Sequence, residues 1–304
     1  MGAFDQAARY AAQADASVVP ARLLAGSGLA LAFREWLDTR TIPLPGGPDR
    51  TADLVAALDD SASADSPWLL VLEFQAQVDA DKLDVTLEEV AILRSRARHG
   101  DERKGKYRVA AGLVYTRDRC PDDTLDMRLP DGSGTRHAPR VWNVAEDDAA
   151  SALEAVTAGS VSWGTLFWVP LMAGADDDAT VQRWKDVVTA RVGDRSTRGN
   201  IAVVALVFAE LAGRAIIWNR ALEDFDMTES QVVNDWISKG EAKGELRKEQ
   251  QLLLRLLNKR FPGAVPPEVA KLISEQESLD LLNHWFDAAA SAVTYDEFFT
   301  VLKR

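Results

Sequence analysis

Apolar and polar positions recur with regular spacing along several stretches of the chain, and this spacing predicts the first helices and strands. Residues Phe4–Ala14 and Leu83–Arg98 carry apolar side chains at helical spacing and are expected to be helices. The apolar run Leu29–Trp36 is interpreted as a further helix. Two apolar runs, Leu54–Leu58 and Trp68–Leu72, flank a small polar segment and predict two adjacent strands joined by a hairpin loop.

Two more strands are expected after this hairpin. Tyr107–Tyr115 is made mostly of small and β-branched residues and predicts the next core strand. A strand, a helix and a second strand in this order need a right-handed crossover if the strands are parallel. Arg140–Val144 is also rich in residues that favour strands. The expected fold class is therefore α/β, with a mixed sheet flanked by helices.

The second half of the chain has a helical pattern. Ala179–Leu222 predicts helices, and Ile201–Trp218, which is apolar on most sides, predicts a central buried helix. A capping box at Thr228 predicts the start of a long helix that passes through the charged segment Lys239–Glu245. The expected domains are a main domain at 1–226, a helical linker at 227–250 and a small helical domain at 251–304.

Composition narrows the classes of protein that fit this pattern. A chain of 304 residues with 47% hydrophobic content can bury a sizeable core. The longest apolar segment contains Glu210 and Arg214, which favours a buried helix over a membrane span. The N-terminal residues lack the basic and apolar regions of a secretory signal. We therefore expect a soluble cytoplasmic protein with no membrane partner.

The net charge and the local charge distribution give opposite indications about nucleic-acid binding. The net charge of −12 argues against an extended nucleic-acid-binding surface, because phosphate neutralisation supplies most non-specific affinity. Between Arg94 and Arg140, however, twelve Arg and Lys residues outnumber seven Asp and Glu residues. This basic stretch is either a solvated helix end with loops or a track for DNA phosphates. On the second interpretation, the candidate DNA contacts are Arg94, Arg96, Arg98, Lys104 and Lys106.

Two carboxylates occupy notable positions beside the predicted hairpin. Asp53 begins the first strand, and Glu73 ends the second strand, followed by Phe74 and Gln75. Because side chains alternate along a strand, Glu73 and Gln75 should point to one side and Phe74 to the other. A carboxylate after five apolar residues is costly to bury without a partner. A divalent metal shared with Asp53 would compensate that cost, although Asp49 is an alternative ligand.

This arrangement of an Asp on one strand and a Glu-x-Gln on the next resembles the PD-(D/E)XK nuclease superfamily, with Gln75 in the usual lysine position. More narrowly, it resembles the recombination-promoting nuclease and transposase (Rpn) family. The segment Pro170–Gly174, the linker Gly240–Glu245 and the helical tail resemble parts of the same family, so the resemblance covers nearly the whole chain. It implies a restriction-endonuclease-like mixed sheet, followed by a long helix and a small all-helical C-terminal domain.

The resemblance also implies a function. The expected activity is metal-dependent endonucleolytic cleavage of DNA in recombination, with Asp53 and Glu73 holding Mg²⁺ or Mn²⁺. Gln75 would take the catalytic position of the lysine, where it can form hydrogen bonds but brings no positive charge. Asp5 matches an acidic residue that faces the metal site in some relatives. Its alternative role is to stabilise the positive end of a helix dipole.

A second hypothesis assumes the same fold but little or no catalytic activity. On this view the protein is a catalytically weak or inactive nuclease-fold scaffold that binds partners or self-associates through its C-terminal helices. The two hypotheses differ at the acidic pair. Hydrolysis requires the carboxylates of Asp53 and Glu73 to meet in an open pocket, whereas a carboxylate sealed against an arginine inside the core would leave only a framework.

Overall fold

The computed structural model describes most of the chain in segments. The described residues are 2–37, 52–61, 67–77, 79–99, 107–117, 123–227, 230, 246, 248–261, 265–276 and 278–302. Asp49, Lys104, Lys106, the loop 62–66 and most of the expected linker at 227–250 lie outside them. The chain divides into two compact units, residues 1–230 and 231–304, and each is described by itself.

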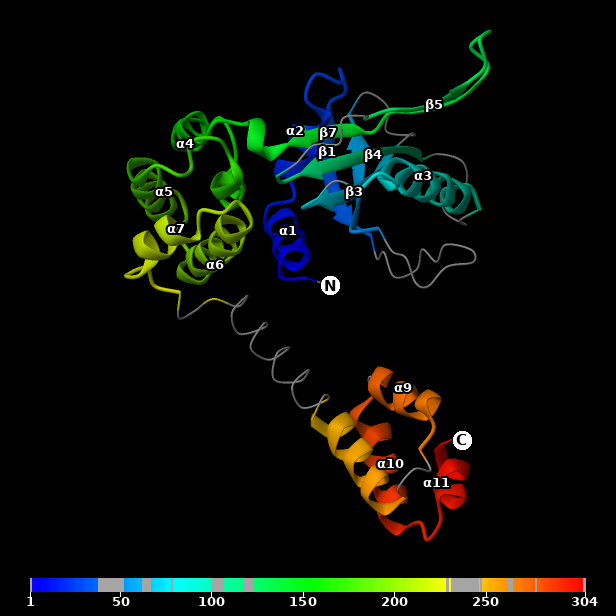
Figure 1. Ribbon diagram of the computed structural model, residues 1–304. Coiled ribbons are helices and arrows are strands. Elements are labelled where there is room, and N and C mark those ends of the chain that lie inside the picture. Colours follow the sequence, from blue (N-terminus) through cyan, green and yellow to red (C-terminus); the bar gives the residue numbers. More distant parts are fainter. Residues whose placement is uncertain are drawn as a thin grey trace. The chain divides into compact units, whose positions relative to one another are not determined.

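The first unit is an α/β fold in which helices flank a mixed sheet, as predicted (Figure 1). Its elements follow the chain in this order: α1 (Ala3–Ala14), α2 (Val18–Leu24), β1 (Leu31–Trp36), β2 (Leu54–Asp60), β3 (Trp68–Gln75), α3 (Lys82–His99), β4 (Arg108–Tyr115), β5 (Leu125–Arg128), β6 (Gly134–His137), β7 (Arg140–Asn143), η2 (Val144–Glu146), α4 (Ala149–Ala158), η3 (Trp163–Phe167), η4 (Val169–Leu171), α5 (Asp178–Arg191), α6 (Arg195–Leu211) and α7 (Ala215–Leu222).

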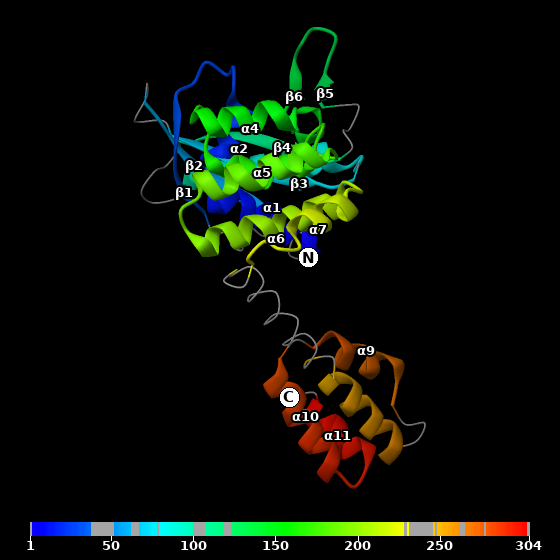
Figure 2. The same cartoon turned by 90° about the vertical axis from the view of Figure 1, so that its left-hand side faces the viewer.

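The main sheet has the strand order β1-β2-β3-β4-β7. β1, β2 and β3 are successively antiparallel, whereas β3, β4 and β7 are parallel. The step from β3 to β4 passes through α3, which confirms the predicted strand, helix and strand unit. β5 and β6 form a separate two-stranded sheet that stands out from the unit in both views (Figures 1 and 2).

The two faces of the main sheet are covered by different helices. Leu69 and Val71 of β3 pack with Leu93 of α3 on one face. On the other face, Phe74 of β3 stacks on Trp168, at 6.0 Å between ring centroids. Figure 2 shows the helical layer of α4 to α7 in front of the sheet on this second side. Alternation along β3 therefore sends odd-numbered residues toward α3 and even-numbered residues toward this layer.

A glycine on β4 allows α2 to lie close to the second face. A Cβ atom added at Gly112 would lie 2.5 Å from Leu23 Cδ1, too close for two carbon atoms. Leu23 is fully buried at this contact. A side chain at this position would therefore force the buried Leu23 side chain to move, and glycine avoids this.

Two sequence predictions of helices are wrong. Residues Leu31–Trp36 form the edge strand β1, paired with β2, because a short apolar run does not distinguish helix from strand and the sheet supplies the hydrogen-bond partners. The expected single helix Ile201–Trp218 is two helices, α6 and α7. Gly213, at φ 74°, lies in the left-handed region between them, and this conformation ends α6.

The second unit is helical, as predicted. Residues 248–260 are helical and are followed by α9 (Pro267–Glu275), α10 (Leu279–Ser291) and α11 (Tyr295–Leu302). Its core contains Leu257, Ile273, Trp285 and Phe298. Among the described residues of the chain, no helix combines the length and the apolar character needed to cross a membrane.

Candidate functional site

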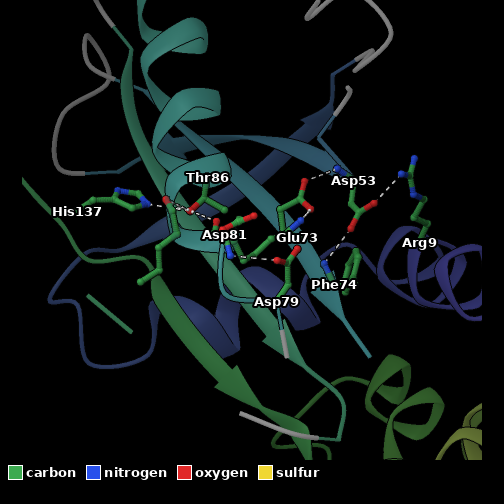
Figure 3. Close-up of polar contacts among 10 residues, drawn as sticks. Arg9, Asp53, Glu73, Phe74, Asp79, Asp81, Thr86 and His137 are labelled. Atoms are coloured by element: carbon green, nitrogen blue, oxygen red, sulfur yellow. Dashed lines mark hydrogen bonds and ion pairs between the residues drawn. The ribbon is translucent and has the colours of Figure 1, made fainter. Parts of the chain in front are cut away.

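The structure places Asp53 and Glu73 side by side where the ladder between β2 and β3 ends. Leu54 opposite Leu72 is the last backbone pair at this end. Beyond it, the Asp53 N–H donates to Glu73 Oε1 at 2.9 Å, and the Phe74 N–H donates to Asp53 Oδ2 at 2.9 Å (Figure 3). Each carboxylate thus accepts a hydrogen bond from a backbone N–H of the neighbouring segment. This exchange fixes the orientation of both carboxylates.

The other oxygen of each carboxylate meets a cationic side chain. Arg9 Nη2 of α1 lies 2.6 Å from Asp53 Oδ1, and these two side chains are 21% and 18% exposed. Lys82 Nζ of α3 lies 2.5 Å from Glu73 Oε2, and these side chains are 13% and 5% exposed. Asp53 pairs with an arginine at a partly exposed position, whereas Glu73 is paired inside the protein. The pocket expected around the acidic pair is therefore closed on the side of Glu73.

The turn between β3 and α3 brings Lys82 back over the end of its own strand. The Asp81 N–H donates to Asp79 Oδ1 at 3.1 Å, which is a local turn at the start of α3 (Figure 3). Lys82 is the first residue of α3 and reaches Glu73 from there. The cation therefore comes from the helix that follows the strand, nine residues after Glu73 in the sequence.

A third carboxyl group lies beside this pair. Glu89 is two helical turns after Lys82 on α3 and is only 4% exposed. Burial raises the pKa of Glu89 to about 9; the charge of Glu73 adds to this rise, and Lys82 opposes it. A carboxyl group with such a pKa holds its proton at neutral pH. Its Oε2 has no hydrogen-bond partner among the described residues.

The same environment shifts the pKa of the other two groups. Burial raises the pKa of Glu73, Asp53 adds to the rise, and the Lys82 ammonium opposes it. Burial lowers the pKa of Lys82, but the charge and hydrogen bond of Glu73, together with the charges of Asp53 and Glu89, outweigh burial, so that the pKa of Lys82 is raised. In the favoured protonation state, Lys82 is charged, and the carboxyl groups around it are not all ionised at the same time.

A histidine supports the first turn of α3. His137 Nε2, at the end of β6, lies 2.9 Å from Thr86 Oγ1 (Figure 3). The Thr86 hydroxyl donates to the carbonyl oxygens of Lys82 and Leu83, at 3.0 and 3.1 Å, so His137 acts as the donor to Thr86. Burial lowers the pKa of His137, which keeps the imidazole neutral. This chain of bonds connects the base of the β5–β6 hairpin to the turn that carries Lys82.

The remaining predicted site residues lie apart from the ion pairs. Gln75 is half-buried at the end of β3, and its carbonyl oxygen accepts from the Thr116 N–H at 3.0 Å. Asp5 accepts from the Gly2 N–H at 2.9 Å in the first turn of α1. Asp5 thus has a helix-end contact, and Arg9, one turn further along α1, contacts Asp53.

The predicted DNA contacts lie away from the carboxylates or outside the described residues. Arg94 is exposed and follows Lys82 by twelve residues, which is about 18 Å of helix rise. The side chains of Arg96 and Arg98 are outside the described part of the chain, as are Lys104 and Lys106. The basic end of α3 and the acidic pair are therefore at opposite ends of this helix.

Sequence reasoning did not find Arg9, Lys82 or Glu89. Their signal is weak, because charged residues are frequent on helices and usually face solvent. One indication was present in the sequence. Glu89 is four residues before Leu93 and therefore lies on the same, apolar face of the helix, whereas a glutamate that faces solvent would lie on the opposite face.

The oxygen donors of the site suit a hard divalent cation, which prefers carboxylates. Within the described ranges, no group of three or more His, Cys, Asp or Glu side chains is arranged to hold a metal ion. Arg9 and Lys82 instead satisfy the outward oxygens of Asp53 and Glu73. A metal shared by these two carboxylates would therefore take over contacts that now belong to the two cations.

A cavity elsewhere in the first unit has a different character. It measures about 630 Å³ and is lined by Arg22, Asp147 and Ser162 among others, but by neither Asp53 nor Glu73. Asp147 pairs with Arg22 through one oxygen and accepts from Trp142 Nε1 through the other, at 2.9 Å. Asp147 and Arg22 of this cavity thus have partners within the protein.

Comparisons of the chain with protein-family models, with curated proteins and with solved structures gave no match. The resemblance to the PD-(D/E)XK and Rpn nucleases consequently depends on the residues and arrangement described above.

Proposed function

We propose that the first unit is a metal-dependent DNA endonuclease of the PD-(D/E)XK type, related to the Rpn nucleases. The observation that carries this proposal is the reciprocal pair of bonds between Asp53 and the Glu73–Phe74 segment. It brings two carboxylates from neighbouring strands together at the point where the strands separate. Each carboxylate has one oxygen held by a backbone amide, and the other oxygen faces a cationic side chain whose place a metal ion would take.

The order of the elements supports the proposal. Two helices precede three antiparallel strands, and a crossover helix then leads to a strand parallel to the third. This is the arrangement expected of a restriction-endonuclease-like core, with the acidic residues at the start of the second strand and near the end of the third. The sheet therefore provides the setting that the chemistry needs.

Each residue of the site has a role in the proposed reaction. Asp53 and Glu73 would hold Mg²⁺ or Mn²⁺ through carboxylate oxygens. The bound ion would acidify a water molecule and offset charge on the scissile phosphate. Lys82 supplies the positive charge that Gln75 lacks, and Gln75, on the same side of β3 as Glu73, can orient a water through its amide. DNA is the substrate on this proposal.

One observation favours a second candidate function. The ion pairs of Asp53 with Arg9 and of Glu73 with Lys82 neutralise both carboxylates without a metal. A catalytically weak or inactive nuclease-fold protein, acting as a binding or self-association scaffold through its C-terminal helices, would retain such pairs. This candidate predicts little or no cleavage under any metal condition.

A plasmid cleavage assay distinguishes the two candidates. The wild-type protein should nick or linearise supercoiled DNA in Mg²⁺ or Mn²⁺, and EDTA should abolish cleavage. Glu73→Ala should reduce the rate by about a hundredfold or more, because it removes a metal ligand. Glu88→Ala, on the exposed side of the same helix as Lys82, is the matched control and should cleave like the wild type.

Two results would count against the proposal in different ways. Cleavage that survives Glu73→Ala unchanged would exclude the acidic pair as the site. A wild-type protein that is inert with Mg²⁺, Mn²⁺, Co²⁺ and Ca²⁺ would favour the scaffold.

A further inference from the structure

The β5–β6 hairpin carries an apolar face into solvent. At its base, Leu125 packs against the buried Leu113 and Tyr115 of the first unit. Side chains alternate along a strand, so Met127 and Leu129 lie on the same face further out. They are 49% and 63% exposed. The hairpin stands away from the rest of the unit in both views (Figures 1 and 2), and the described part of the chain leaves the outer end of this face open.

β5 also has an unpaired edge. Among the described strands, it pairs only with β6. The Leu129 N–H donates to the Ser133 carbonyl oxygen at 2.7 Å, so the backbone groups of odd-numbered residues point toward β6. Those of Asp126 and Arg128 therefore point to the other edge, where the Arg128 N–H donates to Asp126 Oδ1 at 3.1 Å. A strand edge of this kind can pair with a strand from another chain.

The sequence of this edge is complementary to itself in the antiparallel direction. From Leu125 to Leu129 the chain reads Leu-Asp-Met-Arg-Leu. When two copies of β5 run antiparallel with Met127 on a two-fold axis, Asp126 of each copy lies opposite Arg128 of the other. The two leucines lie opposite each other in the same way. Every cross-strand pair then joins unlike charges or two apolar side chains, and the charged residues are also those whose backbone groups face this edge.

Charge identifies a second copy of this chain as the partner. The hairpin residues 125–137 include two acidic residues, Asp126 and Asp131, and two arginines, Arg128 and Arg136. A ribbon without net positive charge offers DNA phosphates little attraction. Copies with a net charge of −12 repel one another and need a contact at which unlike charges meet. The side chains of Asp126 and Arg128, both 42% exposed, provide such a contact.

We propose that the chain forms a homodimer through β5, in which two hairpins join edge to edge into a four-stranded antiparallel sheet with its two-fold axis at Met127. The Arg128 N–H exchanges Asp126 Oδ1 of its own copy for the Asp126 carbonyl oxygen of the other. The apolar faces of the two hairpins become continuous over Met127 and the flanking leucines. This interface uses neither the acidic pair nor the C-terminal helices, and it does not depend on nuclease activity.

Sedimentation equilibrium of the full chain at several concentrations measures the association. The wild type should form a species of twice 33.3 kDa as its concentration rises. Asp126→Arg and Arg128→Asp each place like charges opposite one another at both ends of the strand pair. Each should weaken association about tenfold or more. An equimolar mixture of the two variants brings unlike charges together again, and it should recover the association.

A cysteine at the two-fold axis tests the register. Because the backbone groups of Met127 point to β6, the two copies of this residue form a non-hydrogen-bonded pair with Cα atoms about 4.5 Å apart, which a disulfide can span. Met127→Cys, combined with Cys120→Ser to remove the native thiol, should therefore form a covalent dimer on mild oxidation. Thr135→Cys in the same background is the matched control. Thr135 lies opposite Met127 on β6, so its two copies are three strand spacings apart, about 14 Å, and should not cross-link.

Asp178→Arg and Arg220→Asp control for the charge reversals. They reverse an ion pair on α5 and α7 whose side chains are 69% and 64% exposed, and they should associate like the wild type. Thermal unfolding of each variant verifies that the fold is retained. Association that is lost in both β5 variants and recovered in their mixture, with a cross-link at Met127→Cys alone, supports the interface.

Two results would overturn the proposal. One is a wild-type chain that stays monomeric up to about 1 mM. The other is a dimer that Asp126→Arg and Arg128→Asp leave unchanged, because its contact then lies on another surface.

Discussion

The two faces of β3 show how differently one strand can be buried. Toward the helical layer, Leu70, Leu72 and Phe74 pack among apolar and aromatic residues. Toward α3, the apolar residues give way to Glu73, which is 4% exposed and paired with Lys82. Both faces exclude water, but only the first is built entirely from groups that gain free energy by leaving it.

Stability gives no reason for the charged face. A buried ion pair repays the desolvation of its two charges only with good geometry, and apolar residues of similar volume are often at least as stable. The α3 face adds a third carboxyl, Glu89, with an unpartnered oxygen. Groups that cost free energy and are retained together in this way indicate a functional site. The apolar face is accounted for by packing.

The largest effect is expected on the apolar face, at Trp168. This side chain is fully buried, and its ring lies 6.0 Å from Phe74, 5.2 Å from Trp142 and 5.3 Å from Phe208. Trp168→Ala should lower the free energy of unfolding by about 4 kcal/mol, because it leaves a cavity that rigid neighbours cannot fill. Urea denaturation of the first unit measures this loss.

Ile216→Ala provides the matched control for Trp168→Ala. Ile216 is 86% exposed, so its replacement should change the free energy of unfolding by no more than about 0.5 kcal/mol. A loss below about 1 kcal/mol for Trp168→Ala would mean that the aromatic cluster does not hold this face together.

The difference between the faces also explains what the sequence could predict. The strands β2, β3 and β4 and the helix α3 were predicted because their apolar runs are long and regular. Asp53 was singled out because it begins the first strand, and Glu73 because a carboxylate follows an apolar run. The edge strand β1 was predicted as a helix, because its short apolar run fits either element. Only its pairing with β2 makes it a strand.

The partners of the acidic pair were not predictable for a related reason. Arg9 reaches Asp53 across forty-four positions of sequence. Lys82 reaches Glu73 only because a turn folds α3 back over β3. Long-range contacts between charged side chains leave no periodic trace, and a charge on a helix is usually solvated. The sequence thus indicated the carboxylates but not the cations that meet them.

A smaller effect is expected when the ion pair on the α3 face is broken. Lys82→Met removes the ammonium and leaves the buried carboxylate of Glu73 without its partner. The free energy of unfolding should fall by about 3 kcal/mol, as for other buried pairs that lose one member. The double variant Lys82→Met with Glu73→Gln should recover much of that loss, because neither charge remains. Urea denaturation of the two single variants and the double variant gives the coupling energy.

The matched control for this cycle is Arg34→Met with Asp59→Asn, a pair in which Asp59 is 56% exposed. Its coupling energy should be below about 1 kcal/mol. Equal coupling in the two cycles would contradict the distinction between a buried and a surface pair.

The smallest effect is expected at Glu89, and it depends on pH. The pKa of Glu89 is raised from 4.5 in the unfolded chain to about 9 in the folded protein. The folded state therefore binds more protons than the unfolded state between these values, so this group lowers stability as pH rises. Glu89→Gln keeps the shape of the protonated acid and cannot ionise. In EDTA, it should be more stable than the wild type near pH 8, by an amount that falls toward zero near pH 4.

Glu88→Gln separates this effect from a general change in helix charge. Glu88 is exposed, so its replacement should shift the free energy of unfolding by no more than about 0.5 kcal/mol across the pH range. Urea denaturation at several pH values gives the difference between each variant and the wild type, and the titrations of all other groups largely cancel in that difference. If the free energy of unfolding of Glu89→Gln differs from that of the wild type by the same amount at every pH, Glu89 ionises normally. The charged face of β3 would then be more open to water than its neighbouring apolar face.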